Sequence, residues 1–540
     1  MENFSFLLRK DILDLLNKRI SDFKEGYRQN VAILGNELIG KTTLLKTFLN
    51  DISDQKLVPI YVDIIPFEFS LFIKRSMNSL LYNFLKKSQL VSSRESLDIL
   101  VKRSKEFLPQ TTTQIEHFLS KLEKEKPEIL FKELFAIIES FSGESRKQCI
   151  IIFDEFQNLK KLGIKNICQE LGKKIMFEKN TLFIFSSSLK NEAKEILAND
   201  LSLLFGNFET IELQMLNPAN CDYLITNELK GIAVSKEFID FLINFTGGHP
   251  FYLKILCDEA SSECRASQKE TLDKDTLSQT LEKLLFNDWG IFNLKFTTFL
   301  SLVTLNRNKN DFVYLLDAIS IGKNRLKDLM SYFRKPRTEL IAKLNRLIEL
   351  DVLSKNGSFY CINDRLMSFW LKFVHFEKLN SLSPDYTEQA LHFRSKIHAE
   401  IDEFIHTSKK NIADRMLDLF NLFEEDDIQI DRKKIHLSPF KELKIISFDD
   451  TNLKIGIFGK AQDSLWLAAI KEDGINEHDV NEFLKSLKRF KHKTINKIII
   501  GLGDIERNAR LLAKESHIIT WDIASINNLF DLYGKPRIIK

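Results

Sequence analysis

The chain has 540 residues, of which 44% are hydrophobic and 28% charged, a balance that excludes collagen-like, mucin-like and wholly disordered proteins. Its 78 lysines and arginines nearly equal its 75 aspartates and glutamates, so only local basic clusters can indicate a nucleic-acid partner. The length exceeds that of one ordinary domain and predicts about three or four.

Cysteine use and hydropathy indicate the compartment. The cysteines form no CxxC pair, which favours free thiols over disulfides or a zinc site. No segment approaches about 18 uninterrupted apolar residues, and charged residues at positions 2 and 9–11 replace the apolar stretch of a signal peptide. We therefore expect a soluble, cytoplasmic protein with no membrane partner. The cysteines are Cys149, Cys168, Cys221, Cys257, Cys264 and Cys361.

Residues 35–42 read GNELIGKT and lie between an apolar run of strand character, 30–34, and a run with helical spacing, 42–49. In this context, glycines let backbone N–H groups converge on phosphates at the positive end of a helix. Lys41 would supply charge to the β- and γ-phosphates of ATP, and the Thr42 hydroxyl would ligate Mg²⁺. The alternative is a structural glycine turn. The expected nucleotide-binding residues here are Gly35, Asn36, Glu37, Leu38, Ile39, Gly40, Lys41, Thr42 and Thr43.

A second apolar run, CIIIFDE at 149–155, ends in two acids, as a buried parallel strand does at the carboxyl edge of its sheet. Asp154 would hold Mg²⁺ through water. Glu155 would orient and deprotonate the attacking water, the role of a general base in hydrolysis. The alternative is an acidic turn after a core strand.

Two further runs, 58–63 and 181–185, complete a predicted parallel sheet. The second is followed by Ser186, Ser187 and Ser188. One of these hydroxyls, for which we choose Ser186, would sense the γ-phosphate of ATP. A serine-rich strand exit or a helix cap is the alternative for each.

With these motifs the chain resembles the archaeal-type ATPase family, a branch of the AAA+-like and STAND P-loop NTPases. Residues 6–16 (FLLRKDILDLL) look like the family's N-terminal segment, and 246–253 (TGGHPFYL) look like its GGHP element. The resemblance, which covers residues 1 to about 375, implies that a helical lid returns His249 toward the nucleotide. Without it, Gly247 and Gly248 would end one helix, Pro250 would begin the next, and His249 would be a capping residue.

The chain departs from the family pattern at one position. Residues 204–213 (LFGNFETIEL) match a stretch in which the family usually has Arg after Gly, and here that residue is Asn207. Arginines that stabilise a transferring phosphate contribute ~10³ to 10⁵ in rate. The resemblance therefore implies ATP binding with either fast or slow, switch-like hydrolysis.

Between residues 312 and 373, three stretches of helical spacing precede a short hairpin, the order of a winged helix. Asn356-Gly357 is a strong hairpin-turn signal, and its two flanking strands would form the wing. A local excess of basic residues predicts phosphate contact with DNA, whereas a solvated helix face in a protein-packing module is the alternative. These residues are Lys323, Arg325, Lys327, Arg334, Lys335, Arg337, Lys343 and Arg346.

The segment after residue 388 offers a helix, three strands, a helix and two strands, which resembles a restriction-endonuclease-like fold. In active versions the strands carry Asp and Glu-x-Lys; here Gly456 and Ala469 replace both carboxylates and Lys471 remains. Mg²⁺ requires hard oxygen ligands, so nuclease activity is not expected. Substitution of the missing carboxylates by Asp463, Glu472 or Asp473 stays open. The basic run 485–493 could touch phosphates or be a solvated face.

We therefore expect an α/β protein in which the parallel sheet of a P-loop NTPase carries a helical lid, a winged-helix domain and a C-terminal α/β nuclease-like domain. The predicted boundaries are 1–215 for the ATPase domain, 216–295 for the lid, 296–376 for the winged helix, 377–388 for a polar linker and 389–540 for the degenerate nuclease-like domain.

The predicted function is an ATP-binding, ATP-hydrolysing switch whose nucleotide state controls the two C-terminal modules, with ATP and Mg²⁺ as cofactors and DNA as partner. The alternative is a signalling or assembly scaffold that binds ATP structurally and has only protein partners. Glu155 favours hydrolysis and Asn207 favours the scaffold. A homo-oligomer, in which a neighbouring subunit's arginine completes the site, stays open.

Overall fold

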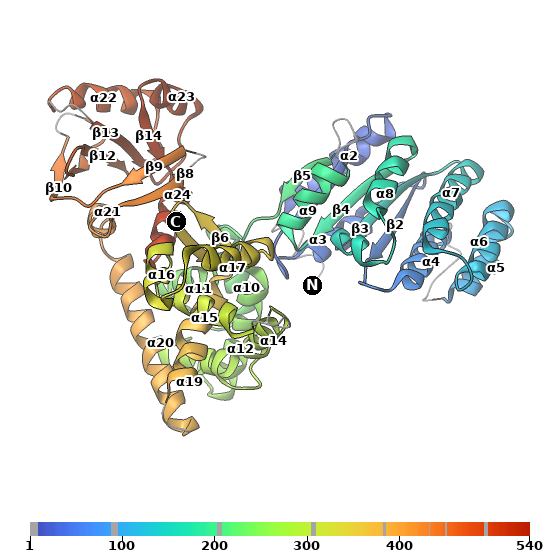
Figure 1. Cartoon of the computed structure of the whole chain (residues 1–540), viewed down its shortest axis with the longest axis horizontal. Coiled ribbons are helices and arrows are strands. Elements are labelled where there is room, and N and C mark those ends of the chain that lie inside the picture. Colours follow the sequence, from blue (N-terminus) through green and yellow to red (C-terminus); the bar gives the residue numbers. More distant parts are fainter. Residues whose placement is uncertain are drawn as a thin grey trace. The chain divides into compact units, whose positions relative to one another are not determined.

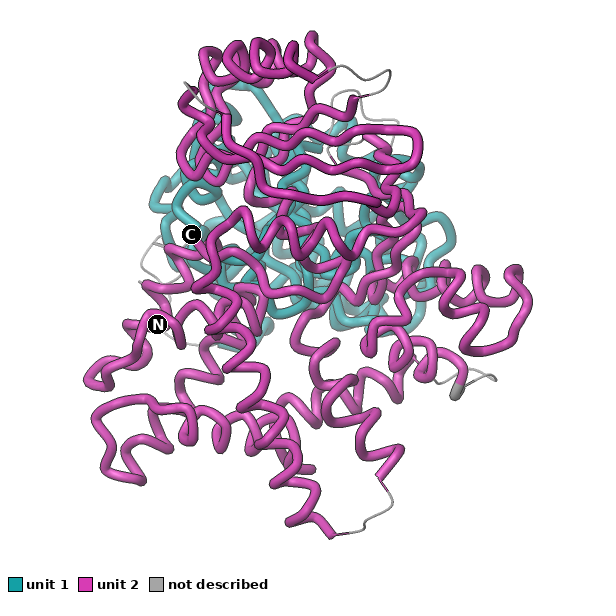
Figure 2. Tube along the Cα trace, turned by 90° about the vertical axis from the view of Figure 1, so that its left-hand side faces the viewer, with its two compact units in different colours: residues 1–216 teal, residues 217–540 magenta. Residues whose placement is uncertain are grey.

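The computed structural model describes residues 9–87, 95–201, 208–303, 309–381, 385–430, 433–448, 451–490 and 495–540. The chain forms two compact units, residues 1–216 and 217–540, which Figure 2 colours separately. Each unit has its own sheet and its own hydrophobic core. The finer five-part division of the chain stays a prediction.

Unit 1 is built on a five-stranded sheet with the strand order β2-β3-β4-β1-β5, and all four strand pairs are parallel (Figure 1). The four strands predicted from the sequence are present. A buried parallel sheet, with a glycine-rich loop after β1 and an acid at the end of β3, matches a P-loop NTPase fold. The strands are β1 (Asn30–Leu34), β2 (Leu57–Asp63), β3 (Gln148–Asp154), β4 (Thr181–Ser187) and β5 (Phe208–Glu212).

Helices pack on both faces of this sheet, which is why β1 and β4 are buried along their whole length. One core lies against α2 and α3, and the other against α4 to α8. Stacked phenylalanines fill the second core; Phe185 contacts Phe153 and Phe208 at centroid distances of 5.7 and 4.8 Å. The elements are α2 (Lys10–Lys24), α3 (Lys41–Asp51), α4 (Phe69–Lys87), α5 (Leu97–Ser104), α6 (Pro109–Lys121), α7 (Pro127–Ser145), η1 (Phe156–Lys161), α8 (Ile167–Phe177), α9 (Lys190–Glu195) and η2 (Ile196–Asp200).

Side chains of helix α4 form hydrogen bonds with backbone N–H and C=O groups along the outer edge of β2. The Tyr61 N–H donates to Ser79 Oγ at 2.9 Å, and Asn83 Nδ2 donates to the Pro59 carbonyl at 2.9 Å. An uncovered edge strand would present these groups to another chain. The same contacts hold α4 beside the end of β2, next to the functional site.

Unit 2 begins with helices that pack mainly on one another. They are α10 (Pro218–Glu228), α11 (Lys236–Thr246), α12 (Pro250–Ala266), α13 (Lys274–Leu281), η3 (Glu282–Phe286), α14 (Ile291–Val303), α18 (Arg365–Trp370), η4 (Leu371–His375), α19 (Phe376–Asn380) and α20 (Tyr386–Ser408). The range predicted to be a polar linker thus has helix at both ends, in α19 and at the start of α20. Residues 382–384 within it lie outside the described residues.

The three helices and hairpin predicted after residue 312 are present as α15 (Lys309–Ser320), α16 (Leu326–Phe333), α17 (Arg337–Glu349), β6 (Leu353–Asn356) and β7 (Phe359–Ile362). Gly357 has φ +57° at the hairpin turn, a conformation that favours glycine. The turn packs on β8 (Asp426–Ile430). Asn356 exchanges hydrogen bonds with the Gln429 backbone, and the Ser358 N–H donates to the Asp427 carbonyl at 2.8 Å.

The C-terminal part of unit 2 has a mixed sheet with the order β10-β11-β12-β13-β14. Helices α21 and α24 pack on one face, and α22 and α23 on the other. The elements are α21 (Ile412–Phe420), β9 (Lys433–Leu437), β10 (Glu442–Ser447), β11 (Ile455–Lys460), β12 (Leu465–Lys471), α22 (Glu477–Leu487), β13 (Ile495–Gly501), α23 (Arg507–Glu515), β14 (Ile518–Trp521) and α24 (Ile523–Leu532). Within the described ranges, no helix is long and apolar enough to cross a membrane.

Candidate nucleotide site

The loop between β1 and α3 has the conformation that its glycines permit. Gly40 caps α3 with φ +100°, in the left-handed region. Gly35 donates its N–H to the Ser187 carbonyl at 3.1 Å, and a Cβ there would lie 3.0 Å from the Leu213 Cβ. The buried Ile39 side chain anchors the loop in the core. The loop is therefore held against the sheet while its tip stays at the surface.

Lys41 is the buried cation of this loop. Its Nζ donates to the Gly35 and Asn36 carbonyls at 3.0 and 2.9 Å and lies 3.8 Å from Glu155 Oε1. Burial lowers the pKa of Lys41, and the carboxylates of Glu155 and Asp154 oppose that shift. The ammonium thus sits at the end of the sheet among acceptors that an incoming anion can replace.

Asp154, at the end of β3, collects three hydroxyl groups. Its Oδ2 accepts from Thr42 Oγ1 at 2.7 Å and from the Tyr61 hydroxyl at 2.8 Å, and its Oδ1 accepts from Ser186 Oγ. The side chain is almost fully buried. The burial and this carboxylate raise the pKa of Tyr61, so the phenol stays a proton donor.

Glu155 follows in the left-handed conformation, with φ +53°. Its Oε2 accepts from Ser188 Oγ at 2.6 Å, from the Ser188 N–H at 3.0 Å and from Gln157 Nε2 at 2.7 Å. Three donors on one oxygen fix the orientation of the carboxylate and leave Oε1 to face Lys41. The side chain is about a quarter exposed, so water can reach it.

The donor set suits Mg²⁺. Thr42 and Asp154 offer a hydroxyl and a carboxylate whose oxygens are 2.7 Å apart. Mg²⁺ is usually held by one or two protein oxygens, with phosphates and water completing an octahedron. Within the described ranges, this site included, no group of three or more His, Cys, Asp or Glu side chains is arranged to hold a metal ion.

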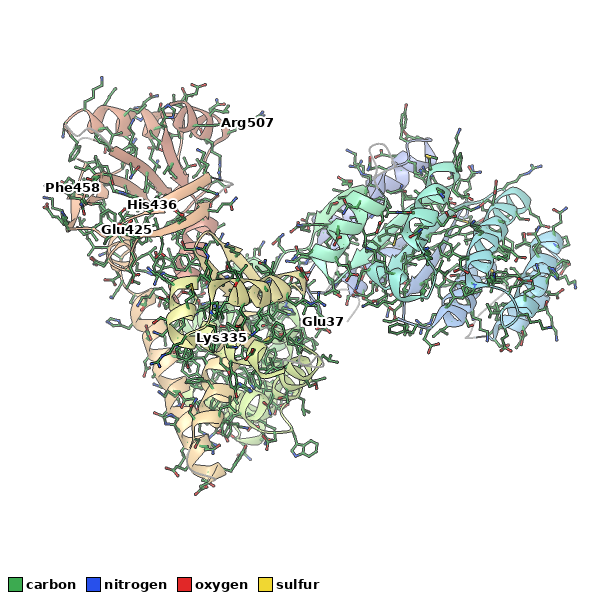
Figure 3. All side chains as sticks on the ribbon, in the orientation of Figure 1. Glu37, Lys335, Glu425, His436, Phe458 and Arg507 are labelled. Carbon is green, nitrogen blue, oxygen red and sulfur yellow. The ribbon has the colours of Figure 1, made fainter. Side chains whose placement is uncertain are left out.

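The remaining predicted loop residues lie around this centre. Glu37, labelled in Figure 3, and Leu38 are exposed at the loop tip, where Leu38 has φ +59°. Asn36 is half-buried and Thr43 is exposed at the start of α3. Their predicted contacts with nucleotide stay predictions.

His249 belongs to unit 2. Gly247, with φ +66°, ends α11, and Pro250 begins α12, as the helix-stop interpretation expected. The buried His249 ring stacks on Tyr252 with the centroids 4.2 Å apart. Its predicted contact with nucleotide stays a prediction, and Asn207 lies outside the described residues.

The sequence analysis missed two residues of the site, Tyr61 and Gln157, and did not anticipate the bond of Ser188 to Glu155. Tyr61 and Asp154 are 93 positions apart, so no local pattern marks their contact. The parallel register of β2 and β3, which sets Asp63 beside Asp154, was the missing information. The one sequence feature that could have indicated a site residue on β2 is the polar end of that strand, at Tyr61 and Asp63.

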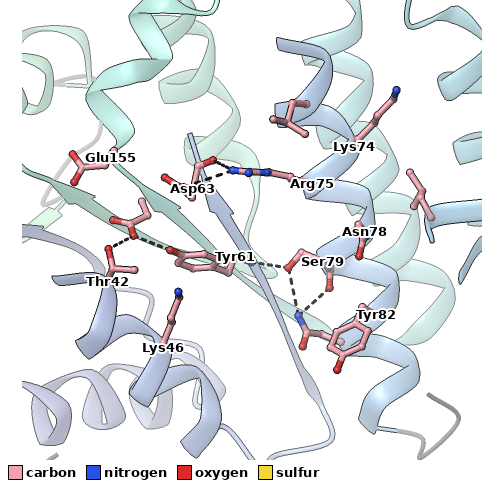
Figure 4. A pocket seen from close by; sticks show the side chains of 14 residues that line it. Thr42, Lys46, Tyr61, Asp63, Lys74, Arg75, Asn78, Ser79, Tyr82 and Glu155 are labelled. Carbon is pink, nitrogen blue, oxygen red and sulfur yellow. Dashed lines mark hydrogen bonds and ion pairs between the residues drawn. The ribbon is translucent and has the colours of Figure 1, made fainter. Parts of the chain in front are cut away.

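A cavity of about 720 Å³ opens beside the site (Figure 4). Thr42, Asp154 and Glu155 line one end, and side chains of β2 and α4 line the rest. Lys46 reaches it from α3. The Arg75 guanidinium reaches it from α4, donating to the Asp63 carbonyl at 2.9 Å.

Gly456 and Ala469 are the two positions at which the sequence resemblance led us to look for catalytic carboxylates. Gly456 and Ala469 are register partners on β11 and β12. A Cβ on Gly456 would lie 2.3 Å from Phe448 Cε2, so the phenyl ring takes the space of a side chain. Lys471 donates to the buried Asp479 at 2.7 Å, and Asp479 belongs to a capping box that starts α22.

Most of the basic residues predicted to contact DNA through the winged-helix segment have acidic partners. Arg325 and Lys327 pair with Asp426 and Glu424, which flank the start of β8. Lys335 and Lys343 pair with Asp311 and Glu339, and Arg346 pairs with Glu349. Lys323, Arg334 and Arg337 are exposed and have no ion pair with any described residue.

Comparisons with protein-family models and with curated proteins found no match. Among solved structures, the chain is similar to a Walker-type ATPase of Pyrococcus abyssi, at 17% identity and a TM-score of 0.48, covering 67% of this chain and 95% of that one. It is similar to the ORC2 protein of Aeropyrum pernix, solved as ADPNP-ADP complexes, at 12% identity and a TM-score of 0.43, covering 73% and 95%. It is also similar to the RuvB Holliday junction branch migration motor of Thermotoga maritima, at 11% identity and a TM-score of 0.32, covering 69% of this chain and 94% of that one. At these values the similarities assign no activity to this chain.

Proposed function

We propose that unit 1 binds ATP with Mg²⁺ and hydrolyses it to ADP and phosphate. The observation that carries this proposal is the 2.7 Å hydrogen bond between Thr42 and Asp154, beside the buried Lys41. It joins the phosphate-binding loop to the acidic end of β3 across 112 positions of sequence. A phosphate-bound Mg²⁺ requires that pair of oxygens at one place.

Each residue of the site has a task in hydrolysis. The loop from Gly35 to Gly40 offers backbone N–H groups to the phosphates at the start of α3. Lys41 exchanges its two carbonyl acceptors for phosphate oxygens. When bound by Thr42 and Asp154, Mg²⁺ neutralises charge on the β- and γ-phosphates. Glu155, oriented by Ser188 and Gln157, accepts the proton of the attacking water through Oε1.

Titration calorimetry with ATP, with and without Mg²⁺, tests the binding step. We expect Mg²⁺ to tighten ATP binding to the wild type, and Asp154→Asn and Thr42→Ala to lose most of that gain. Asp98→Asn, a change on the surface of α5, is the control. Equal affinities with and without Mg²⁺ in the wild type would reject the assignment of these two residues.

For unit 2 we propose a winged helix followed by a restriction-endonuclease-like domain that lacks the catalytic carboxylates. DNA is the proposed partner of the exposed cations on and before α17. Five cations support this assignment because they are exposed and have no ion pair with any described residue. They are Arg334 at the end of α16, Arg337 at the start of α17, and Lys485, Lys488 and Arg489 at the end of α22.

Duplex DNA retardation at several salt concentrations tests this partner. We expect retardation that weakens with salt and falls in an Arg334→Ala/Arg337→Ala variant, while Lys269→Ala, in the loop between α12 and α13, behaves as the wild type. Binding that is absent at low salt would reject DNA as the partner.

The second candidate is an ATP-dependent assembly scaffold with protein partners. The packing of the hairpin turn at Asn356–Ser358 on β8 favours it, because a wing occupied by its own chain cannot enter a DNA groove. The DNA measurement separates the two candidates. If DNA is not retarded and ATP binds, the scaffold is the better account.

A further inference from the structure

The cavity beside the nucleotide site extends away from the phosphate-binding loop. Thr42, Asp154 and Glu155 line its catalytic end, but none of the residues from Gly35 to Lys41 lines it. The cavity therefore borders the phosphate-binding loop only at Thr42, the last residue of the GNELIGKT octet. The cavity continues over β2 toward α4, past Tyr61 and Asp63 (Figure 4).

Three cationic side chains line the cavity. Lys46 projects from α3, and Lys74 and Arg75 project from α4. Both lysines are exposed, and no described residue forms an ion pair with either. Arg75 is held by Asp63, whose carboxylate lies 3.6 Å from its guanidinium. Lys46 and Lys74 can thus bind an anion directly, and Arg75 can bind one if the anion replaces Asp63 as its partner.

Neutral groups complete this wall. Asn78 and Tyr82 follow Lys74 and Arg75 on α4 at helical spacing and line the same cavity. They offer an amide and a phenol to the body of a ligand. The volume, about 720 Å³, lies within the range of small-molecule sites. Phosphate monoesters with a sugar or a base combine charge at one end with hydrogen-bonding groups at the other.

We propose that this cavity is a second binding site, for a phosphate monoester of about mononucleotide size that sits beside ATP. The proposal rests on the proposed function, since ATP occupies the neighbouring loop. The monoester phosphate binds Lys46, Lys74 and Arg75 and draws Arg75 from Asp63. Because Asp63 is the register partner of Asp154, occupancy of the cavity changes the charge next to the Mg²⁺ ligand.

The test uses the full chain with Glu155→Gln, loaded with saturating ATP and Mg²⁺ so that the first site is filled. Calorimetry with AMP, ribose 5-phosphate and adenosine then reports on the second site. We expect AMP and ribose 5-phosphate to bind with one further site per chain and adenosine not to bind. In this background, Lys74→Ala/Arg75→Ala should weaken the binding of AMP and of ribose 5-phosphate at least tenfold, while the chain should still bind ATP.

Two controls keep the outcomes distinct. Lys124→Ala removes an exposed lysine elsewhere in unit 1 and should bind like its parent, and Asn78→Ala tests the same wall without removing charge. The proposal is overturned if neither phosphate ester binds the ATP-loaded chain, or if the double variant binds both as tightly as its parent. Ester binding that depends on Lys74 and Arg75 in a chain that does not bind ATP would reject the proposed function and keep the cavity.

Discussion

Glu155 is the proposed general base for ATP hydrolysis, and hydrogen bonds hold its carboxylate in one orientation. One of its oxygens is engaged by Ser188 and Gln157, and the other faces Lys41 at 3.8 Å. A general base must be oriented before it can accept a proton, and hydrogen bonds to one carboxylate oxygen provide that orientation. In the proposed hydrolysis, Ser188 is therefore a positioning residue that acts through Glu155.

Ser188→Ala should lower kcat for ATP hydrolysis about 10- to 100-fold, because a hydrogen bond to a charged group contributes about 1.5–3 kcal/mol. ATP affinity should change by less than about twofold, since Ser188 touches no predicted phosphate ligand. Ser188→Thr retains the hydroxyl and should keep more of the rate. Steady-state kinetics with a separate binding measurement check this, and an equal loss of affinity and rate would contradict it.

His436 gives a prediction of pH dependence. Its ring lies between Asp427, at 3.0 Å, and Glu425, at 2.9 Å; Figure 3 labels His436 and Glu425. The bond to Asp427 and then that to Glu425 raise the pKa of His436. A raised pKa in the folded state stabilises the fold below the unfolded pKa of about 6.5, and this gain is lost as the pH rises through the folded value.

An NMR titration should therefore place the pKa of His436 above about 6.5. Asp427→Asn should lower it, while Asp463→Asn, an exposed change on another loop, should not. A pKa at or below the ordinary value in the wild type would contradict the hydrogen-bonded geometry.

At the residue scale, a local motif predicted only part of the site. The octet around Lys41 and the two acids at the end of β3 have spacings that the chemistry imposes, so the sequence alone indicates them. Tyr61 reaches Asp154 from a neighbouring strand, and that neighbour relation depends on strand order. The contact of Ser188 with Glu155 depends on the same arrangement.

At the scale of elements, the packing around β11 and β12 explains why position 456 has no room for a side chain larger than that of glycine. The nearest heavy atoms to a Cβ on Gly456 would be Phe448 Cε2 at 2.3 Å and the Ala468 carbonyl oxygen at 2.6 Å. One is an aromatic ring inside a core and the other is backbone, so neither can move freely.

Gly456→Ala should destabilise unit 2 by about 1–3 kcal/mol, the usual cost of overpacking a core. Gly143→Ala is the matched control. A Cβ on Gly143, an exposed position in α7, meets nothing within 4 Å, and alanine in a helix gains about 0.5–1 kcal/mol over glycine. Urea unfolding followed by fluorescence compares the two, and equal stability of both variants would contradict the packing described for β11.

Elements with strong periodicity or a marked turn could be predicted, such as the hairpin around Gly357. The hairpin of β8 and β9 was missed although Ile428, Ile435 and Leu437 are buried at alternating positions. Charged residues in β8 and β9 made the alternation of buried and exposed positions hard to recognise in the sequence. The contact of the first hairpin with β8 joins segments about 70 positions apart and has no local signal.

At the scale of the whole molecule, unit 2 is held together by charged contacts between distant parts of its sequence. Asp531 on α24 accepts from Arg365, at the start of α18, and from Arg537 at 3.0 Å. Asn244 on α11 accepts from both arginines, through Arg365 Nη2 and the Arg537 N–H. The C-terminal segment is thus tied to helices that precede it by more than 160 positions.

Asp531→Ala should lower the stability of unit 2 by about 1.5–3 kcal/mol, because two arginines lose a charged acceptor. Asp418→Ala, which removes the half-exposed partner of Lys410, should cost less than about 1 kcal/mol. Thermal and urea unfolding of the full chain check the difference. Equal losses in both variants would show that this contact is no stronger than a surface ion pair.

The central claim is that the end of the unit 1 sheet hydrolyses ATP, and phosphate release tests it most directly. Wild type, Lys41→Ala and Glu155→Gln are compared at saturating ATP and Mg²⁺, with ATP binding measured in parallel. We predict turnover in the wild type, weak binding and no turnover for Lys41→Ala, and binding without turnover for Glu155→Gln. Turnover by Glu155→Gln at the wild-type rate, or ATP binding without turnover in the wild type, would contradict the account.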